Sequence, residues 1–225
     1  MDCCQCRGIE QQFDQAHIER NLKTYRKRGA EYSTRLLIAQ LLAEHVAGAT
    51  LLDIGGGVGA IQHALLEAGA ATAMGVDASS ASLEAARQEA TRRGFADQVS
   101  YLFGDFVALA PTIPHADIVT LDRVVCCYHD MPGLVLASLA CTQRLYGLVY
   151  PRDDWWVRLG VRLLNGGLTL QRNPFRIFCH RTAEVERLIT SQGFERMFQR
   201  STGMWQVVIF RRIGAANTAQ TEPSA

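Results

Sequence analysis

The chain has 225 residues, of which 23 are basic and 22 acidic, so its net charge is close to zero. With this balance nothing global argues for an anionic membrane or for nucleic acid as a partner, and nucleic acid is not expected because no dominating basic face neutralises phosphates. No apolar run reaches the roughly 20 residues that a membrane-spanning helix requires. The length and the hydrophobic fraction of 48% favour a single globular domain with a full core.

The first 48 residues are expected to form a helical cap. Residues 11–28 are polar and compatible with a helix, and leucines at helical spacing predict another helix over residues 31–46. The first 15 residues show neither the basic start nor the apolar stretch of a signal peptide. The seven cysteines are an odd number and are interpreted as reduced thiols, so we expect a cytoplasmic protein.

Strands and helices are expected to alternate from residue 49. The expected strands cover residues 50–54, 72–77, 99–105, 116–122 and 144–151, and the helices between them cover 59–69, 82–94 and 134–142. Such alternation is typical of parallel strands joined by helical crossovers, with helices on both faces of the sheet. We therefore predict an α/β fold of the Rossmann-like type.

The alternation stops after residue 151. Residues 152–180 are interpreted as an irregular insertion that carries arginines and aromatic side chains. A helix over 182–194 and strands over 195–201 and 204–212 follow, and the short turn between these strands predicts an antiparallel hairpin. The predicted sheet is thus mostly parallel, has seven strands and ends in a hairpin, within a domain spanning residues 49–213. Residues 214–225 are small and polar, and we expect a disordered tail there.

The stretch LLDIGGGVGA at residues 51–60 predicts a cofactor-binding loop between a strand and a helix. Backbone N–H groups of such a loop face a ligand at the carboxyl edge of the sheet. Gly55, Gly57 and Ala60 fit the spacing of dinucleotide-binding loops, whereas Gly55, Gly57 and Gly59 fit a second spacing, preceded by Asp53. A carboxylate at Asp53 would repel a pyrophosphate but suits a cationic amino group. The loop therefore favours S-adenosylmethionine over a dinucleotide.

Two more carboxylates follow the next strands. Asp77 ends the second strand, where its carboxylate can accept hydrogen bonds from both hydroxyls of a ribose. Asp105 follows the third strand and is placed to accept from an adenine amino group, with Phe106 supplying a backbone N–H or a ring face. These positions match the nucleoside part of S-adenosylmethionine.

Three motifs together resemble those of the class I S-adenosylmethionine-dependent methyltransferases. They are DIGGGVG at residues 53–59, GVD at 75–77 and GDF at 104–106, and the resemblance runs over residues 51–212. It implies the class I Rossmann-like fold, methyltransferase activity and S-adenosyl-L-methionine as the cofactor.

The second half of the chain is similar to the magnesium-protoporphyrin O-methyltransferases, which esterify a propionate carboxyl of a tetrapyrrole. The stretches ADIVTLDRVVCCYHDMPG, RLYGLVYPRDDWW and FRIFCHRTAEVERL carry this similarity. The similarity implies an active-site aspartate at the end of the fourth strand, Asp122, and a tyrosine on a covering helix, Tyr25. It also implies a recurring pair before the last helix, Arg176 and His180.

A carboxylate acceptor is ionised at neutral pH and needs no base, only cations that hold it. Arg152 and Arg176 in the insertion are candidates for that role, with Trp155 and Trp156 as flat apolar walls. The insertion at about 152–180 is accordingly interpreted as a substrate lid.

A hydroxyl acceptor would instead profit from a general base. His129 is the candidate, because it follows the fourth strand and imidazole titrates near neutral pH. Asp122 could orient this histidine. The acceptor is therefore expected to be a small molecule methylated on a carboxylate or hydroxyl oxygen.

Five cysteines depart from the similar family or lie outside its motifs. Cys126 and Cys127 stand where that family carries a histidine–tyrosine pair, and Cys3, Cys4 and Cys6 form a second cluster. A thiophilic substrate such as arsenic, held by both clusters, is one alternative acceptor. The spacing is not that of a zinc finger or ribbon, and we expect no metal site.

Two further classes of protein are compatible with a glycine loop of this kind. One is a non-catalytic module that binds S-adenosylmethionine, and the more distant one is a nicotinamide-dependent oxidoreductase. The intact glycine motif and a lid that carries arginines and tryptophans favour an enzyme over the binding module. The expected partner is a small-molecule substrate, with no nucleic acid and no membrane span.

Overall fold

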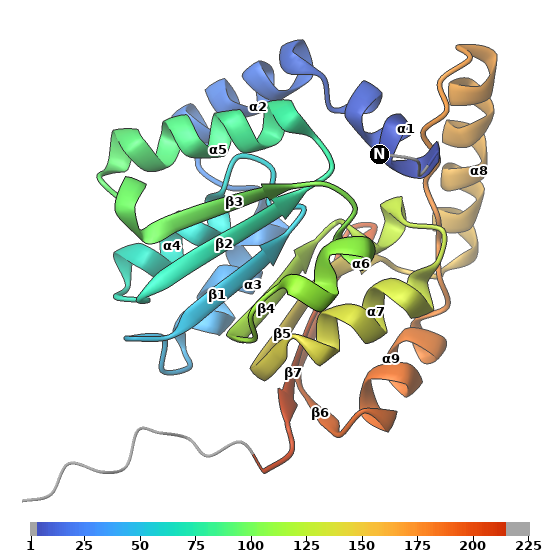
Figure 1. Ribbon diagram of the computed structural model, residues 1–225. Coiled ribbons are helices and arrows are strands. Elements are labelled where there is room, and N and C mark those ends of the chain that lie inside the picture. The colour runs from blue at the N-terminus through green and yellow to red at the C-terminus, as the bar shows by residue number, and fades with distance from the viewer. Residues whose placement is uncertain (1–3, 215–225) are drawn as a thin grey trace, which may run out of the picture.

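The computed structural model of the protein describes residues 4–214, with side chains from residue 6 onward. Seven strands in this range form one sheet in the order β3-β2-β1-β4-β5-β7-β6 (Figure 1). They are β1 (Thr50–Ile54), β2 (Thr72–Asp77), β3 (Val99–Phe103), β4 (Ala116–Asp122), β5 (Thr142–Pro151), β6 (Phe194–Thr202) and β7 (Trp205–Arg212). Strands β1 to β5 are parallel, and β7 pairs antiparallel with both β5 and β6. The predicted mostly parallel seven-stranded sheet with a terminal hairpin is confirmed.

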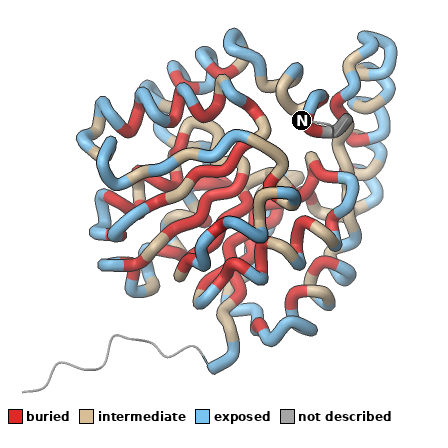
Figure 2. Tube along the Cα trace, viewed as in Figure 1, coloured by how far each residue is buried: buried red, intermediate tan, exposed pale blue. Residues whose placement is uncertain are grey.

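The core lies on both faces of the central strands, which are the most deeply buried part of the molecule (Figure 2). Helices α3 (Tyr32–Leu42) and α4 (Ala60–Glu67) cover one face, where Leu37 and Leu65 are fully buried. Helices α7 (Met131–Ala140) and α9 (Thr182–Ser191) cover the other face, where Tyr146 and Phe194 are fully buried. This arrangement leaves the carboxyl edge of the parallel strands open.

A helical cap lies across that edge. Helices α1 (Cys4–Gln12) and α2 (Gln15–Arg28) are separated at Asp14, whose carboxylate caps α2 by accepting from the His17 N–H at 2.8 Å. The cap is fastened to α5 (Ser80–Arg93) by Arg26, which donates to the buried Glu89 carboxylate at 2.8 Å. The start of α5 is held in turn by Glu10 of α1, which accepts from the Ser80 N–H.

The expectation of an irregular insertion at 152–180 is wrong for its first half, which forms the sixteen-residue helix α8 (Trp155–Leu170). Glycines at 160, 166 and 167 weaken the helical pattern of the sequence, and this is why the pattern favours an irregular segment. Figure 1 shows α8 standing at the edge of the molecule, with residues 171–181 running back toward the sheet. The short α6 (Phe106–Leu109) follows β3. The predicted tail lies outside the described residues beyond 214.

Candidate functional site

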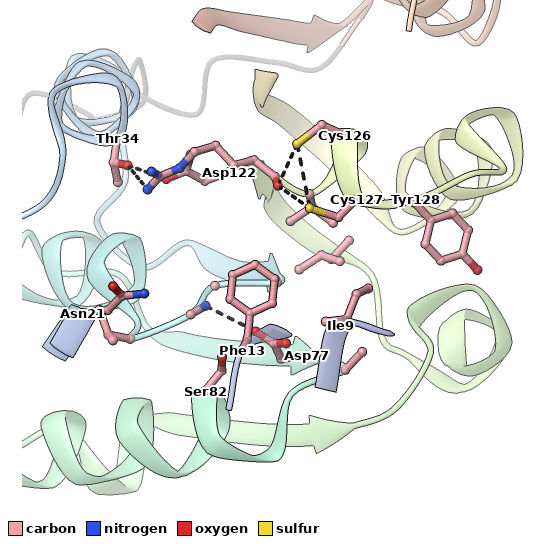
Figure 3. Close-up of a pocket in the computed structure, with 18 of the residues that line it drawn as sticks. Ile9, Phe13, Asn21, Thr34, Asp77, Ser82, Asp122, Cys126, Cys127 and Tyr128 are labelled. Atoms are coloured by element: carbon pink, nitrogen blue, oxygen red, sulfur yellow. Dashed lines mark hydrogen bonds and ion pairs between the residues drawn. The ribbon is translucent and has the colours of Figure 1, made fainter. Parts of the chain in front are cut away.

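A cavity of about 590 Å³ opens at the carboxyl edge of the parallel strands, between the cap and α8. This volume is within the roughly 300–1,000 Å³ of small-molecule sites. One end is formed by the loops after β1, β2 and β3, and the other by the loop after β4 with parts of α3, α8 and β7 (Figure 3). Phe13, Asn21 and Tyr25 of the cap lie over both ends.

The glycine loop lines the first end with Gly55, Gly56 and Gly57. Gly55 and Gly57 have φ of 64° and 57°, the left-handed region that side chains rarely adopt. A Cβ on Gly55 would lie 2.4 Å from a methyl group of Val124, and one on Gly56 would lie 2.2 Å from the Asp53 carboxylate. Around Gly57 there is open space, so its bare backbone faces the cavity. Gly59 precedes α4 with φ 80° and does not line the cavity.

Asp53 lies beneath this loop and not on the cavity wall. Its carboxylate accepts from the Thr120 hydroxyl at 2.7 Å and from the Gln62 amide at 3.0 Å. Complete burial raises the pKa of Asp53 to about 7, although these two hydrogen bonds lower it. In this geometry Asp53 supports the loop through β4 and α4.

Asp77 and Asp105 line the first end, as does Phe106. Asp77 accepts from the Ser79 N–H at 2.9 Å and the Gly57 N–H at 3.3 Å, which ties the β2 edge to the glycine loop. Burial raises the pKa of Asp77 to about 6. Asp105 accepts from the Tyr128 hydroxyl at 2.9 Å and caps α6 through the Val107 N–H. The three residues predicted for the nucleoside thus lie at the same end of the cavity.

The second end is built around Asp122, the last residue of β4. One carboxylate oxygen accepts from the Thr34 hydroxyl of α3 at 2.5 Å, and the other lies 3.3 Å from Nε of Arg123. Burial raises the pKa of Asp122, and the adjacent Arg123 opposes that shift. Asp122 therefore fixes one side of the Arg123 guanidinium inside the cavity.

Arg123 is a functional candidate that sequence reasoning missed. Among the described residues it is the one Lys or Arg that lines the cavity. Its φ is 63°, a strained value for a side chain of this size, and its guanidinium lies 5.8 Å from the Trp205 ring centre and 3.3 Å from the Glu31 carboxylate. In the sequence, only its position directly after Asp122, the aspartate that ends β4, could have indicated a functional role for Arg123.

Two adjacent thiols lie beside Arg123. Cys126 and Cys127 line the cavity with their sulfur atoms 3.8 Å apart, and both donate to the Arg123 carbonyl oxygen (Figure 3). Its neighbour Cys127 and its own burial raise the pKa of Cys126, which favours the protonated thiol. Cys6 of α1 also lines the cavity, whereas Cys3 and the Cys4 side chain lie outside the described residues.

Tyr25 of the cap lines the cavity, and its hydroxyl lies 3.5 Å from Nδ1 of His63. The two rings are stacked with centres 6.2 Å apart, and Arg93 lies over the Tyr25 ring. Burial raises the pKa of Tyr25 and lowers that of His63 to about 4, so both are neutral at physiological pH.

Five residues predicted for catalysis or substrate binding do not line the cavity. His129 is exposed, and its ring stacks on the ring of Tyr128. Trp155 and Trp156 lie on the outward side of α8. Arg152 forms an ion pair with Asp154, and Arg176 donates to two backbone carbonyls.

His180 holds the segment after α8 against the β4 loop. Its Nε2 lies 3.1 Å from the carbonyl oxygens of both Val125 and Tyr128, and the Phe178 N–H donates to the Cys126 carbonyl at 2.7 Å. The insertion therefore reaches the cavity through apolar side chains, namely Val161, Leu164, Phe175 and Ile177.

The sheet order, the antiparallel β7 and the glycine loop at the end of β1 define the class I S-adenosylmethionine-dependent methyltransferase fold. Residues 51–142 match the family described as methyltransferase domain. The chain therefore has the class I methyltransferase fold and carries a methyltransferase domain over residues 51–142. S-adenosylmethionine is the cofactor of such domains.

One curated protein similar to part of the chain is the ribosomal protein L11 methyltransferase of Erwinia tasmaniensis, 36% identical over 72 residues. The match covers 32% of this chain and spans only 25% of that relative's length.

Among solved structures, magnesium protoporphyrin IX methyltransferase from Synechocystis with bound S-adenosylhomocysteine has a TM-score of 0.72 at 18% identity, covering 92% of this chain and 99% of that one. Mitomycin 7-O-methyltransferase has a TM-score of 0.60 at 23% identity, and the match covers 82% of this chain and 56% of that one. A structure of the Haloferax volcanii methyltransferase activator Trm112 in complex with a methyltransferase has a TM-score of 0.69 at 16% identity. The match covers 90% of this chain and 96% of that one. These similarities show the fold.

Proposed function

We propose that the protein transfers a methyl group from S-adenosylmethionine to a carboxylate oxygen of a small-molecule acceptor. The observation that carries the proposal is that one cavity joins the glycine loop to the guanidinium of Arg123. The first end fits the cofactor, because the bare Gly57 backbone and the Asp77 carboxylate face the same space. We further propose a cytoplasmic location, because the odd number of cysteines favours reduced thiols.

Two features favour a carboxylate over a hydroxyl acceptor. Arg123 can bind a carboxylate through two parallel N–H groups, and the exposed Glu31 that now pairs with it can be displaced by the acceptor. The base predicted for a hydroxyl acceptor, His129, does not line the cavity. Because burial raises the pKa of Asp122, its negative charge opposes an anionic acceptor less than that of an ordinary aspartate.

The residues act by orientation. When bound, the cofactor supplies an electrophilic methyl group on a sulfonium, and transfer is an in-line displacement that leaves S-adenosylhomocysteine and a methyl ester. Asp77 and Asp105 orient the nucleoside, while Arg123 holds the acceptor carboxylate toward the loop. Alignment of this kind lowers the activation free energy of such reactions by roughly 7–11 kcal/mol. Tyr25 and the apolar wall of α8 restrict water.

The test uses methyl-labelled S-adenosylmethionine with a panel of apolar carboxylic acids, including a dipropionate tetrapyrrole, and the matching primary amides. The proposal predicts label on acids and none on amides. A carboxyl ester releases its label as volatile methanol in mild alkali, whereas an ether or a methylamine keeps it. Label that resists alkali on every product would contradict a carboxylate acceptor.

A second candidate acceptor is a thiophilic metalloid such as trivalent arsenic. The 3.8 Å spacing of the Cys126 and Cys127 sulfurs inside the cavity favours it, since soft ligands of this type bind soft ions. The same assay with arsenite as acceptor tests this candidate, and the Cys126→Ser variant should then lose all transfer. Transfer to arsenite that survives this substitution would exclude the thiol pair as its ligand.

A further inference from the structure

Helix α8 exposes a large apolar surface. Trp155, Leu163 and Leu170 are 77%, 70% and 87% exposed, and Trp156 and Leu159 are exposed as well. Positions 155, 159 and 163 are successive turns of one helix face, and 156 and 170 lie beside them. On the inward side only Val157 and Val161 are buried. Contiguous exposed apolar patches of this kind mark interaction surfaces.

The charged residues of α8 and of the segment that follows it are all basic. Residues 155–183 contain five arginines and no acidic side chain, although the chain as a whole is nearly neutral. Arg158 forms an ion pair with Asp153, which precedes the helix, and the guanidinium of Arg176 donates hydrogen bonds to backbone carbonyls. Arg162 and Arg172 are exposed and form no ion pair with a residue in the described range 6–214. Positive charge therefore lies beside the apolar face at Arg162 and just beyond the end of the helix at Arg172.

We propose that α8 is a reversible docking helix for an anionic membrane surface. A helix with Trp and Leu on one face and arginines beside them is typical of helices that lie in the lipid interface, where the arginines meet anionic headgroups. Pairing of α8 with a second copy would offer no acidic partner from the facing helix to Arg162 and Arg172, because residues 155–183 contain no acidic side chain. No helix in the described residues is long and apolar enough to span a bilayer, so the contact is with the surface.

The position of α8 links docking to the cavity. Figure 1 shows the helix at the rim of the molecule, next to the cap, and Figure 2 shows exposed residues along its outer side. The same helix supplies Val161 and Leu164 to the acceptor end. A docked helix would therefore place the cavity beside the bilayer, from which an apolar acceptor could enter.

The experiment is vesicle co-sedimentation of the full chain, with vesicles of phosphatidylcholine alone and with about 30% phosphatidylglycerol, an anionic lipid. We expect binding to the anionic vesicles only, weakened at least about tenfold by roughly 0.5 M salt because the Debye length shortens. The double variants Leu163→Ser/Leu170→Ser and Arg162→Glu/Arg172→Glu should each lower the bound fraction by roughly tenfold or more. Met197→Ser and Arg200→Glu on the exposed face of β6 are the matched controls and should bind like the wild type.

Affinity for S-adenosylhomocysteine, measured on every variant, shows that each one is folded. Absence of binding to anionic vesicles by the folded wild-type protein would overturn the proposal. So would binding that both α8 double variants retain. A wild-type dimer that becomes monomeric in Leu163→Ser/Leu170→Ser would assign the same face to a second copy instead. The outcome is independent of which acceptor is methylated.

Discussion

At the residue scale, the proposed acceptor end of the cavity depends on Arg123. Its strained backbone turns the guanidinium inward, between Asp122, Glu31 and the Trp205 ring. Strain of this kind persists only where surrounding contacts hold it, here those made by the β4 carboxylate and by Glu31.

Replacement of Arg123 by Met should raise the KM for a carboxylate acceptor by roughly 10- to 150-fold, since charged hydrogen bonds contribute about 1.5–3 kcal/mol. Arg123→Lys should recover only part of this loss, because an ammonium lacks the planar fork. Initial-rate kinetics measure the effect, and titration with S-adenosylhomocysteine should give unchanged affinity. A cofactor affinity reduced in parallel with acceptor binding would argue against an acceptor role for Arg123.

Asp77 should make cofactor affinity depend on pH. In the proposed cofactor complex the ribose hydroxyls would donate to the ionised carboxylate, so binding should favour the ionised form. Burial raises the pKa of Asp77 in the free protein to about 6. Affinity for S-adenosylhomocysteine should therefore be constant above about pH 7 and fall as the pH drops below about 6, by up to about tenfold per unit. Calorimetric titrations at several pH values measure it. The Asp77→Asn variant should bind weakly and without this dependence.

At the scale of elements, one buried carboxylate helps to fasten the cap to α5. Glu89 of α5 accepts from Arg26, Arg92 and Arg93, and the hydrogen bonds from Arg92 and its neighbours hold the pKa of Glu89 far below its usual range. Of these three arginines, Arg26 is the one that belongs to the cap.

Arg26→Ala should detach α2 locally while the domain stays folded. Loss of this contact costs about 1 kcal/mol, so amide hydrogen exchange in residues 15–28 should become roughly five times faster. Arg87→Ala is the matched control, because Arg87 forms an exposed pair with Glu84 within α5. Equal acceleration in both variants would show that Glu89 does not anchor the cap.

At the scale of the whole molecule, Asp53 should link stability to pH. Its folded pKa of about 7 lies above the value of an unfolded aspartate, so the folded state holds a proton that the unfolded chain releases. The contribution of Asp53 is therefore favourable at low pH and declines between about pH 4 and 7, by at most about 1.4 kcal/mol per unit.

Asp53→Asn should remove this slope. Within residues 6–214 the buried carbonyl oxygen of Gln62 has no hydrogen-bond partner. A flipped Gln62 amide can therefore accept from the amide introduced at position 53 while Thr120 still donates. Urea unfolding at about pH 5 and 7 measures the difference between variant and wild type, in which all other groups cancel. The variant should gain relative stability at the higher pH; a constant difference would mean that Asp53 is ionised throughout.

The cofactor end could be predicted from sequence because its parts are local. Glycines at fixed spacing and carboxylates at strand ends follow from short motifs, and the parallel sheet brings strand ends to one edge. Asp77, Asp105 and Phe106 accordingly lie together.

The acceptor end could not be predicted in the same way. Whether Arg152, Arg176 or Arg123 faces the cavity depends on how α8 and the segment after it pack, and no short pattern encodes that. The glycines of α8 also concealed the helix itself. Asp53 lies between these two cases. The sequence identifies the glycine loop that follows it, but the burial of Asp53 beneath that loop depends on packing.

Isothermal titration of S-adenosylhomocysteine into the wild-type protein and into Asp77→Ala and Arg123→Met addresses the cofactor end directly. We predict micromolar binding by the wild type and by Arg123→Met, and its loss in Asp77→Ala, because the Asp77 carboxylate faces the cavity beside the glycine loop. Failure of the folded wild-type protein to bind, or unchanged binding by Asp77→Ala, would contradict the assignment of this cavity to S-adenosylmethionine.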